Sequence, residues 1–216
     1  MVKITVDNRE IEAAEGMPLL EACLKNDIYI PNLCWIDGMK TPSASCRLCF
    51  VEIEGEKTPL PACTVPTRGG LVVRTDSPAV RELQRSGLAL LLSVHHVDCR
   101  HCHANKKCAL QRLARFLKVT LKPKHLDHVL KPVETDETHS CLVHFPNRCV
   151  LCGRCVHVCR EVHGQPLISF AKRGFDTVIR FQIARNGSDA DCESCGACAA
   201  ACPVGALTTR AVLRGR

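Results

Sequence analysis

The chain has 216 residues and a formal net charge of +7, with 17 cysteines but only six Phe, one Trp and one Tyr. Cysteine at this level leaves three explanations: disulfides, structural zinc or iron–sulfur clusters. Disulfides fit poorly, because MVKITVDNRE lacks the apolar core of a secretion signal and many cysteines stand three apart, a spacing that suits metal ligation in a reducing compartment. The longest apolar run, LALLLSV, is too short to span a bilayer. We therefore expect a cytoplasmic protein without a transmembrane segment.

The positive charge could indicate a nucleic-acid partner, but the count treats every cysteine as neutral. Fifteen cysteines bound as thiolates to four oxidised clusters would leave about seven negative charges on those sites, so the loaded chain would be near neutral. No arginine-rich arm with interleaved aromatic residues supports nucleic-acid binding either. We expect no nucleic-acid partner.

The first third of the chain predicts a small mixed sheet with one helix. Apolar stretches predict four strands, at 2–6, 9–13, 50–54 and 71–75. Asp7 and Asn8 supply the turn between the first two strands. The segment PLLEACLKN (18–26) predicts a short helix, with Pro18 in a favourable early position. Together these elements predict an α+β domain over residues 1–77.

Two helices are predicted in the next segment, residues 78–120. Ser77 followed by Pro78 signals a helix start. An apolar face follows it, formed by Val80, Leu83, Leu90, Leu91 and Val94. This helix would place His95 at its carboxyl end. A second helix, over about 109–118, carries leucines on one side.

The final segment, residues 148–216, follows an irregular connector at 121–147 and contains an internal repeat. Strand-like segments at 167–171 and 177–181 lie between its two halves. Each half has four cysteines spaced C-x2-C-x2-C-x3-C: Cys149, Cys152, Cys155 and Cys159, then Cys192, Cys195, Cys198 and Cys202. This spacing is typical of ferredoxins with two [4Fe–4S] clusters, in which the fourth cysteine of a run ligates the other cluster.

The repeat therefore predicts two interleaved ligand sets. One [4Fe–4S] cluster is assigned to Cys149, Cys152, Cys155 and Cys202, and the other to Cys159, Cys192, Cys195 and Cys198. Three thiolates on a tight loop cover one side of a cube, and a short helix carries the fourth to its neighbour. Paired zinc sites are the alternative, but two identical runs would be an unusual way to supply tetrahedral zinc.

Two further sets precede the repeat. The first is Cys34, Cys46, Cys49 and Cys63, and the second is His95, Cys99, Cys102 and Cys108. Long loops around a C-x2-C suit a small cluster held under a sheet, although spacing alone leaves zinc open for both sets. The nearby His96, His101 and His103 are expected to be solvated loop residues. Cys23 and Cys141 remain, and we expect them to be small buried residues rather than ligands.

Two segments carry a family resemblance. PNLCWIDGMKTPSASCRLCFVEIEG resembles the β-grasp [2Fe–2S] domain that opens the large iron–sulfur subunit of respiratory NADH dehydrogenase. HHVDCRHCHANKKCALQ is similar to the motif that follows in that family, in which one histidine and three cysteines bind a [4Fe–4S] cluster. The resemblance implies a [2Fe–2S] cluster on the set that begins at Cys34 and a [4Fe–4S] cluster on the set that begins at His95. A neutral imidazole in place of a thiolate should raise the potential of the second.

The resemblance covers almost the whole chain and extends to the amino-terminal part of di-iron hydrogenases and to the small diaphorase subunit of NAD(P)-linked hydrogenases. Because the chain stops soon after Cys202, the free-standing diaphorase subunit is the better match. It implies a three-domain protein (β-grasp, small helical, and two-cluster bacterial ferredoxin-like) with one [2Fe–2S] and three [4Fe–4S] clusters.

Such a subunit relays electrons between a flavoprotein that oxidises NAD(P)H and a hydrogenase catalytic subunit, within a hetero-oligomeric complex. No nucleotide-binding glycine motif follows a strand, and no catalytic residues are expected. The same relay in a formate dehydrogenase or an NADH dehydrogenase-type complex is one alternative. A zinc-stapled scaffold without a redox role is another.

Overall fold

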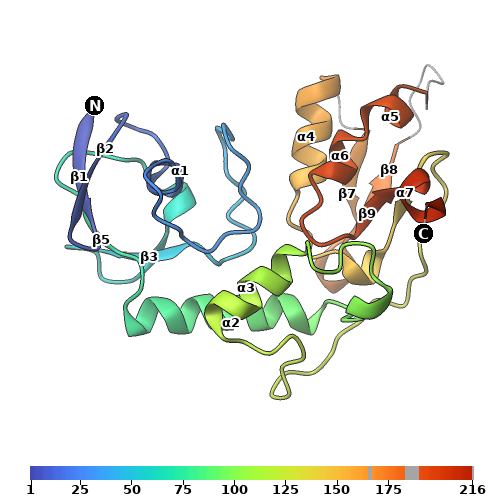
Figure 1. Cartoon of the computed structure of the whole chain (residues 1–216), viewed down its shortest axis with the longest axis horizontal. Coiled ribbons are helices and arrows are strands. Elements are labelled where there is room, and N and C mark those ends of the chain that lie inside the picture. Colours follow the sequence, from blue (N-terminus) through green and yellow to red (C-terminus); the bar gives the residue numbers. More distant parts are fainter. Residues whose placement is uncertain (165–166, 183–189, 216) are drawn as a thin grey trace. The chain divides into compact units, whose positions relative to one another are not determined.

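The computed structural model describes residues 1–164, 167–182 and 190–215, shown in Figure 1. It divides into two compact units. Unit 1 comprises Met1–Ala89 and Phe116–Val119, and unit 2 comprises Leu90–Arg115 and Thr120–Arg216. The division falls inside two helices, α2 (Pro78–Ser93) and α3 (Ala109–Leu117), so the segment 78–120 is shared between the units. None of the described helices is both long and apolar enough to cross a bilayer.

Unit 1 is built on a five-stranded sheet of order β2-β1-β5-β3-β4. Its strands are β1 (Val2–Val6), β2 (Arg9–Ala13), β3 (Phe50–Ile53), β4 (Leu60–Pro61) and β5 (Val72–Arg74). β1 pairs in parallel with β5 and the other neighbours are antiparallel, so the sheet is mixed. The four predicted strands are all present. β4 was not predicted, because two residues with a proline leave little pattern to detect.

The hairpin between β1 and β2 turns at Asp7 and Asn8, as predicted. Both residues have positive φ angles, 49° and 66°, a backbone shape that Asp and Asn tolerate and that fits the twist of a two-residue hairpin. The Asp7 carboxylate also accepts hydrogen bonds from the backbone N–H and the hydroxyl of Thr75, at 2.8 and 2.6 Å. The turn is thereby joined to the chain just after β5.

The core of unit 1 lies between the sheet and α1 (Leu19–Lys25) (Figure 1). Leu19, Leu20 and Cys23 of this helix are fully buried among the inward side chains of the strands. Pro18 caps the helix, where its missing N–H costs no hydrogen bond. Cys23 is therefore a core residue, as expected.

Helix α2 begins as predicted, since the Ser77 hydroxyl accepts a hydrogen bond from the Val80 N–H at 3.2 Å. Its buried face differs from the prediction: Leu83 and Leu90 are exposed, whereas Gln84 and Gly87 are buried.

The apolar pattern of the sequence did not predict this buried face, because Gln84 and Gly87 are part of it and neither has an apolar side chain. The Gln84 amide donates to the Phe50 carbonyl at 3.1 Å, so its burial leaves the amide N–H satisfied. A Cβ on Gly87 would lie 2.6 Å from the Arg47 carbonyl oxygen, so the helix approaches the loop before β3 too closely for any side chain.

Unit 2 contains two antiparallel strand pairs with short helices around them (Figure 1). The pairs are β6 (Leu142–His144) with β9 (Leu207–Thr209), and β7 (Ile168–Ala171) with β8 (Val178–Phe181). The helices beyond α3 are α4 (Arg154–His163), α5 (Ala190–Cys195), α6 (Ala197–Ala200) and α7 (Arg210–Arg214). The connector was predicted to be irregular throughout, but its end forms β6. The reason is that its partner β9 lies far along the chain and leaves no local signal.

The segment after α2 is joined to the repeat by main-chain hydrogen bonds within unit 2. The His96 N–H donates to the Asn147 carbonyl at 2.6 Å, and the Ala109 N–H donates to the Pro203 carbonyl at 2.8 Å. The second bond connects the start of α3 to the residue after Cys202. Backbone bonds do not depend on side-chain identity, so this attachment is built into the fold.

Candidate iron–sulfur centres

The four cysteines of the first predicted set in unit 1 are all buried and lie close to one another in pairs. The Sγ atoms of Cys34 and Cys46 are 3.4 Å apart. The hydrogen-bond contact with Cys46 lowers the pKa of the Cys34 thiol to about 5, and the contact with Cys49 lowers the pKa of Cys63. The partner thiols, Cys46 and Cys49, each have a raised pKa. The charges of Cys34 and Cys46 also raise the pKa of Cys63, so the two pairs are neighbours in the structure.

Backbone shape helps to place these cysteines. Arg47, between Cys46 and Cys49, has a φ of +53°, and Leu151, between Cys149 and Cys152, has a φ of +52°. Left-handed residues of this kind curl a loop so that successive N–H groups face inward, which suits an anionic metal–sulfur group. Neither Arg47 nor Leu151 is a glycine, although glycine is the usual residue in this conformation. The Arg47 guanidinium also packs 4.7 Å from the centre of the Phe50 ring.

The second set begins at His95, which lies just after α2 and is only 8% exposed. Its Nδ1 is 2.9 Å from the Arg148 carbonyl oxygen, and burial lowers the pKa of its imidazole to about 4. Burial raises the pKa of the Cys108 thiol, and the nearby thiols of Cys102 and Cys99 raise it further. These three cysteines therefore share one neighbourhood. The contact between them and His95 stays a prediction.

The three neighbouring histidines have other surroundings. His96 is exposed, as expected. His101 is also exposed, and its Nδ1 lies 2.9 Å from an Asp98 carboxylate oxygen. His103 differs from the expectation of a solvated residue, because its half-buried ring packs against Phe145, with centroids 6.2 Å apart.

The third set combines both runs of the repeat. Burial raises the pKa of the Cys149 thiol to about 11 and that of Cys152 to about 12, and both thiols also feel the charge of Cys202. Burial also raises the pKa of Cys155, and Cys149, Cys152 and Cys202 raise it further. Thus the last cysteine of the second run lies with three cysteines of the first. The Cys202 Sγ in addition accepts hydrogen bonds from the N–H groups of Ala206 and Leu207, at 3.3 and 3.4 Å.

The fourth set mirrors the third. Burial raises the pKa of the Cys198 thiol to about 12, and Cys159, Cys192 and Cys195 raise it further. All four cysteines line one cavity in unit 2. The pKa of Cys155 is also raised by Cys198, which shows that the third and fourth sets are neighbours. Cys141 is buried beside them in the same core, as expected.

The donor sets fit iron–sulfur chemistry. Thiols provide the ligands, apolar side chains surround them, and backbone N–H groups point at one of the sulfurs. In residues 1–164, 167–182 and 190–215, no three His, Cys, Asp or Glu side chains are placed so that they could share a single metal ion. The sequence did not indicate the Arg148 carbonyl or the N–H donors to Cys202, because backbone groups leave no residue-type signal. His139, which lines the cavity of the fourth set, was also not singled out.

Three family models match successive parts of the chain. Residues 1–78 match the 2Fe-2S iron-sulfur cluster binding domain. Residues 84–122 match the NADH-ubiquinone oxidoreductase-G iron-sulfur binding region. Residues 140–208 match the ferredoxin-like domain of NADH-quinone oxidoreductase subunit 3.

Curated relatives are similar over nearly the whole chain. Identity is 34% with NADP-reducing hydrogenase subunit HndD of Solidesulfovibrio fructosivorans, over 96% of this chain and 36% of that protein. Identity is 34% with NADPH-Fe(3+) oxidoreductase subunit alpha of Geobacter sulfurreducens, over 100% of this chain and 25% of that protein. Identity is 30% with the mitochondrial NADH-ubiquinone oxidoreductase 78 kDa subunit of Neurospora crassa, over 97% of this chain and 28% of that protein. The chain thus spans about a quarter to a third of the length of these relatives.

A solved structure gives a longer match. A chain in the crystal structure of the NAD+-reducing [NiFe]-hydrogenase in the H2-reduced state aligns with a TM-score of 0.85 and 32% identity, covering 97% of this chain and 88% of that one. Together, fold and sites define an iron–sulfur protein of ferredoxin-like α+β domains. The chain belongs to the family of iron–sulfur electron-transfer subunits found in hydrogenase and NADH dehydrogenase complexes.

Proposed function

We propose that the chain holds one [2Fe–2S] and three [4Fe–4S] clusters and relays electrons in an NAD(P)-linked hydrogenase. The [2Fe–2S] ligands are Cys34, Cys46, Cys49 and Cys63. The three [4Fe–4S] ligand sets are His95 with Cys99, Cys102 and Cys108; Cys149, Cys152, Cys155 and Cys202; and Cys159, Cys192, Cys195 and Cys198. The arrangement is a β-grasp domain (1–77), a small helical domain (78–120), a connector (121–147) and a two-cluster ferredoxin-like domain (148–216).

The observation that carries this proposal is the exchange of fourth cysteines between the two runs. Cys202 lies with the thiols of the first run, and Cys159 lies with those of the second. Interleaving of this kind is typical of two-cluster ferredoxins, whereas two independent zinc sites would not require it.

Clusters of these types accept and release single electrons when bound. The residues of the chain set the conditions under which this happens. The buried imidazole of His95 is neutral at ordinary pH and carries no ligand charge. The two N–H donors at Cys202 withdraw charge from its sulfur. Ligand charge, hydrogen bonds to sulfur and burial all shift reduction potential, so the fold adjusts each site separately.

The partners in this proposal are a flavoprotein subunit that oxidises NAD(P)H and a hydrogenase catalytic subunit, in a cytoplasmic hetero-oligomer. The relatives named above support it, since two of them are hydrogenases linked to NAD+ or NADP. The similarity to the NADH-ubiquinone oxidoreductase 78 kDa subunit favours an NADH dehydrogenase-type complex as a second candidate. Purification of the native complex, with identification of its subunits, separates the two.

Metal analysis of protein purified without oxygen tests the cluster content. We expect about fourteen iron atoms per chain with matching sulfide, and paramagnetic signals after dithionite reduction. A colourless protein that contains zinc in place of iron, with no reducible signal, would contradict the relay.

A further inference from the structure

In the described part of the chain, His139 is the one polar side chain other than cysteine that lines the cavity of the fourth cysteine set. Among the described residues that line it are Cys159, Cys192, Cys195 and Cys198, several aliphatic groups, and His139. His139 comes from the connector and lies outside both cysteine runs. Its ring also packs edge-on against Phe181, with centroids 5.0 Å apart. An imidazole is thus placed beside the space that these four thiols enclose.

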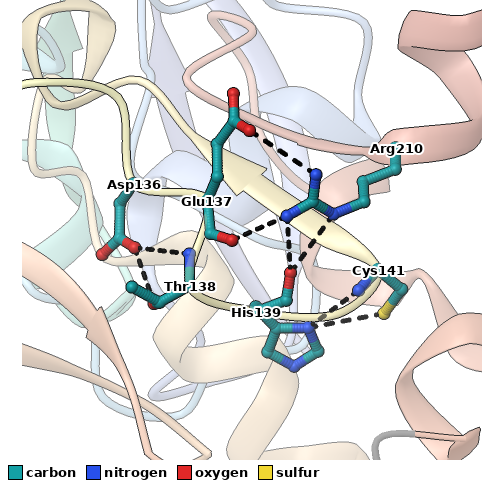
Figure 2. A network of polar contacts seen from close by, with 6 residues as sticks. All are labelled: Asp136, Glu137, Thr138, His139, Cys141 and Arg210. Carbon is teal, nitrogen blue, oxygen red and sulfur yellow. Dashed lines mark hydrogen bonds and ion pairs between the residues drawn. The ribbon is translucent and has the colours of Figure 1, made fainter.

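Hydrogen bonding fixes which ring nitrogen of His139 carries the proton. The Cys141 N–H donates to its Nδ1 at 3.2 Å, and the Cys141 Sγ lies 3.5 Å from the same atom (Figure 2). A backbone N–H can only donate, so Nδ1 is the acceptor and the ring proton resides on Nε2. The ring that lines the cavity is therefore an N–H donor.

The main chain that carries His139 is held in place by Arg210, the first residue of α7 (Figure 2). The Arg210 guanidinium donates to the Glu137 carbonyl at 2.6 Å and to the His139 carbonyl at 3.2 Å. The Arg210 N–H also donates to the Cys141 carbonyl at 2.8 Å. Contacts at three alternate residues thus hold the main chain of residues 137–141, so the orientation of the imidazole does not depend on the ring contacts alone.

We propose that His139 tunes the [4Fe–4S] cluster bound by Cys159, Cys192, Cys195 and Cys198, by donating a hydrogen bond from Nε2 to its sulfur. The inference rests on the proposed function, because it needs that cluster. Reduction adds negative charge to the cluster, and a hydrogen-bond donor stabilises the more negative state. His139 therefore raises the reduction potential of this cluster relative to a site without the donor, and it does so through a hydrogen bond and not as a ligand.

Redox-poised electron paramagnetic resonance of the full chain, purified without oxygen, tests this role. His139→Phe keeps a ring against Phe181 but removes the donor. We expect the equilibrium constant for reduction of one cluster to fall about tenfold, which for one electron is about 59 mV. His139→Gln retains an N–H and should lie closer to the wild type. His125→Phe removes an exposed histidine of the connector and should change nothing. The shifted signal should be the one that Cys195→Ser alters.

Unchanged potentials in His139→Phe would overturn the proposal, as would equal shifts in the Phe and Gln variants, since packing alone would then explain them. Electron–nuclear double resonance of the wild type supplies a readout that needs no substitution. An exchangeable proton coupled to this cluster is expected after transfer to deuterated buffer, and its absence would also overturn the role of His139. If the wild type shows no reducible signal, the cluster assignment itself fails, which is a different result.

Discussion

The Nδ1 atom of His95 lies 2.9 Å from the backbone carbonyl oxygen of Arg148. A carbonyl only accepts hydrogen bonds, so Nδ1 carries the proton and the lone pair of Nε2 is directed elsewhere. Metal-binding histidines in general have this arrangement, with one nitrogen on the metal and the other donating to a fixed acceptor. The segment before Cys149 thereby orients the ring that precedes Cys99.

Replacement of His95 by Cys is expected to retain a [4Fe–4S] cluster but to lower its potential, because a charged thiolate replaces a neutral ligand. Redox-poised electron paramagnetic resonance measures the change. His96→Cys, at the exposed neighbouring position, is the control and should leave every potential unchanged. If His95→Cys leaves the full set of potentials as in the wild type, His95 is not a ligand.

Substitution of Cys23 separates core cysteines from ligands. Burial raises the pKa of the Cys23 thiol to about 12, so it packs as a neutral group against the sheet. Cys23→Ala should keep all the iron and lose about 1–2 kcal/mol of unfolding free energy from the lost packing. Cys63→Ala, by contrast, should lose the [2Fe–2S] cluster. Iron and sulfide analysis of the two variants, with urea denaturation, checks both. A loss of two irons in Cys23→Ala would contradict the assignment.

Gly87→Ala is expected to destabilise unit 1, although alanine usually favours a helix. The new Cβ would lie 2.6 Å from the Arg47 carbonyl oxygen, so the helix or the cysteine loop must move. Overpacking of this kind costs about 1–3 kcal/mol. Gly69→Ala is a control, because nothing lies within 4 Å of its Cβ position. Thermal unfolding compares the variants, and equal midpoints would show that the contact relaxes without cost.

These positions show which parts of the structure follow from local sequence. The hairpin at Asp7 and the cap at Ser77 depend on residue type and spacing, and both could be predicted. The buried face of α2 could not, because Gly87 is there for close approach and Gln84 for a single hydrogen bond to the Phe50 carbonyl.

Contacts between segments far apart in the chain could not be predicted from the sequence either. The strand β6 and the position of His139 depend on β9 and Arg210, which lie more than sixty residues further along the chain. No local periodicity reports such contacts. The same holds for the carbonyl of Arg148, which matters as an acceptor irrespective of its side chain.

The burial of His144 predicts that the free energy of unfolding of unit 2 falls in acid. It is 1% exposed, and neither ring nitrogen has a hydrogen-bond partner among the described residues. Burial lowers its pKa to about 4; the positive charges of Arg180 and Lys131 act in the same direction, and Asp136 opposes them. At pH values between the unfolded and folded pKa, the unfolded chain therefore binds a proton at His144 and the folded chain does not. The stability that the neutral His144 ring contributes is fully present above the unfolded pKa of about 6.5 and is lost as pH falls towards 4.

Urea denaturation at pH 7.5 and pH 5.5 measures this effect. The wild type should lose about 1 kcal/mol more than His144→Leu over that interval. His125→Leu removes an exposed histidine and should behave as the wild type does. Parallel behaviour of His144→Leu and the wild type would mean that the imidazole is protonated in the folded state.

The placement of Cys202 beside Cys149 sets an order for maturation. During synthesis the ligands in the Cys34 set emerge early, whereas the site that begins at Cys149 stays one thiolate short until Cys202 has left the ribosome. The Leu207–Thr209 strand, whose first N–H donates to the Cys202 sulfur, emerges later still. A nascent polypeptide stalled before that point would expose three unmatched thiolates to oxygen. A cluster at the proposed Cys149 site could therefore gain its full ligand set only after Cys202 has been synthesised.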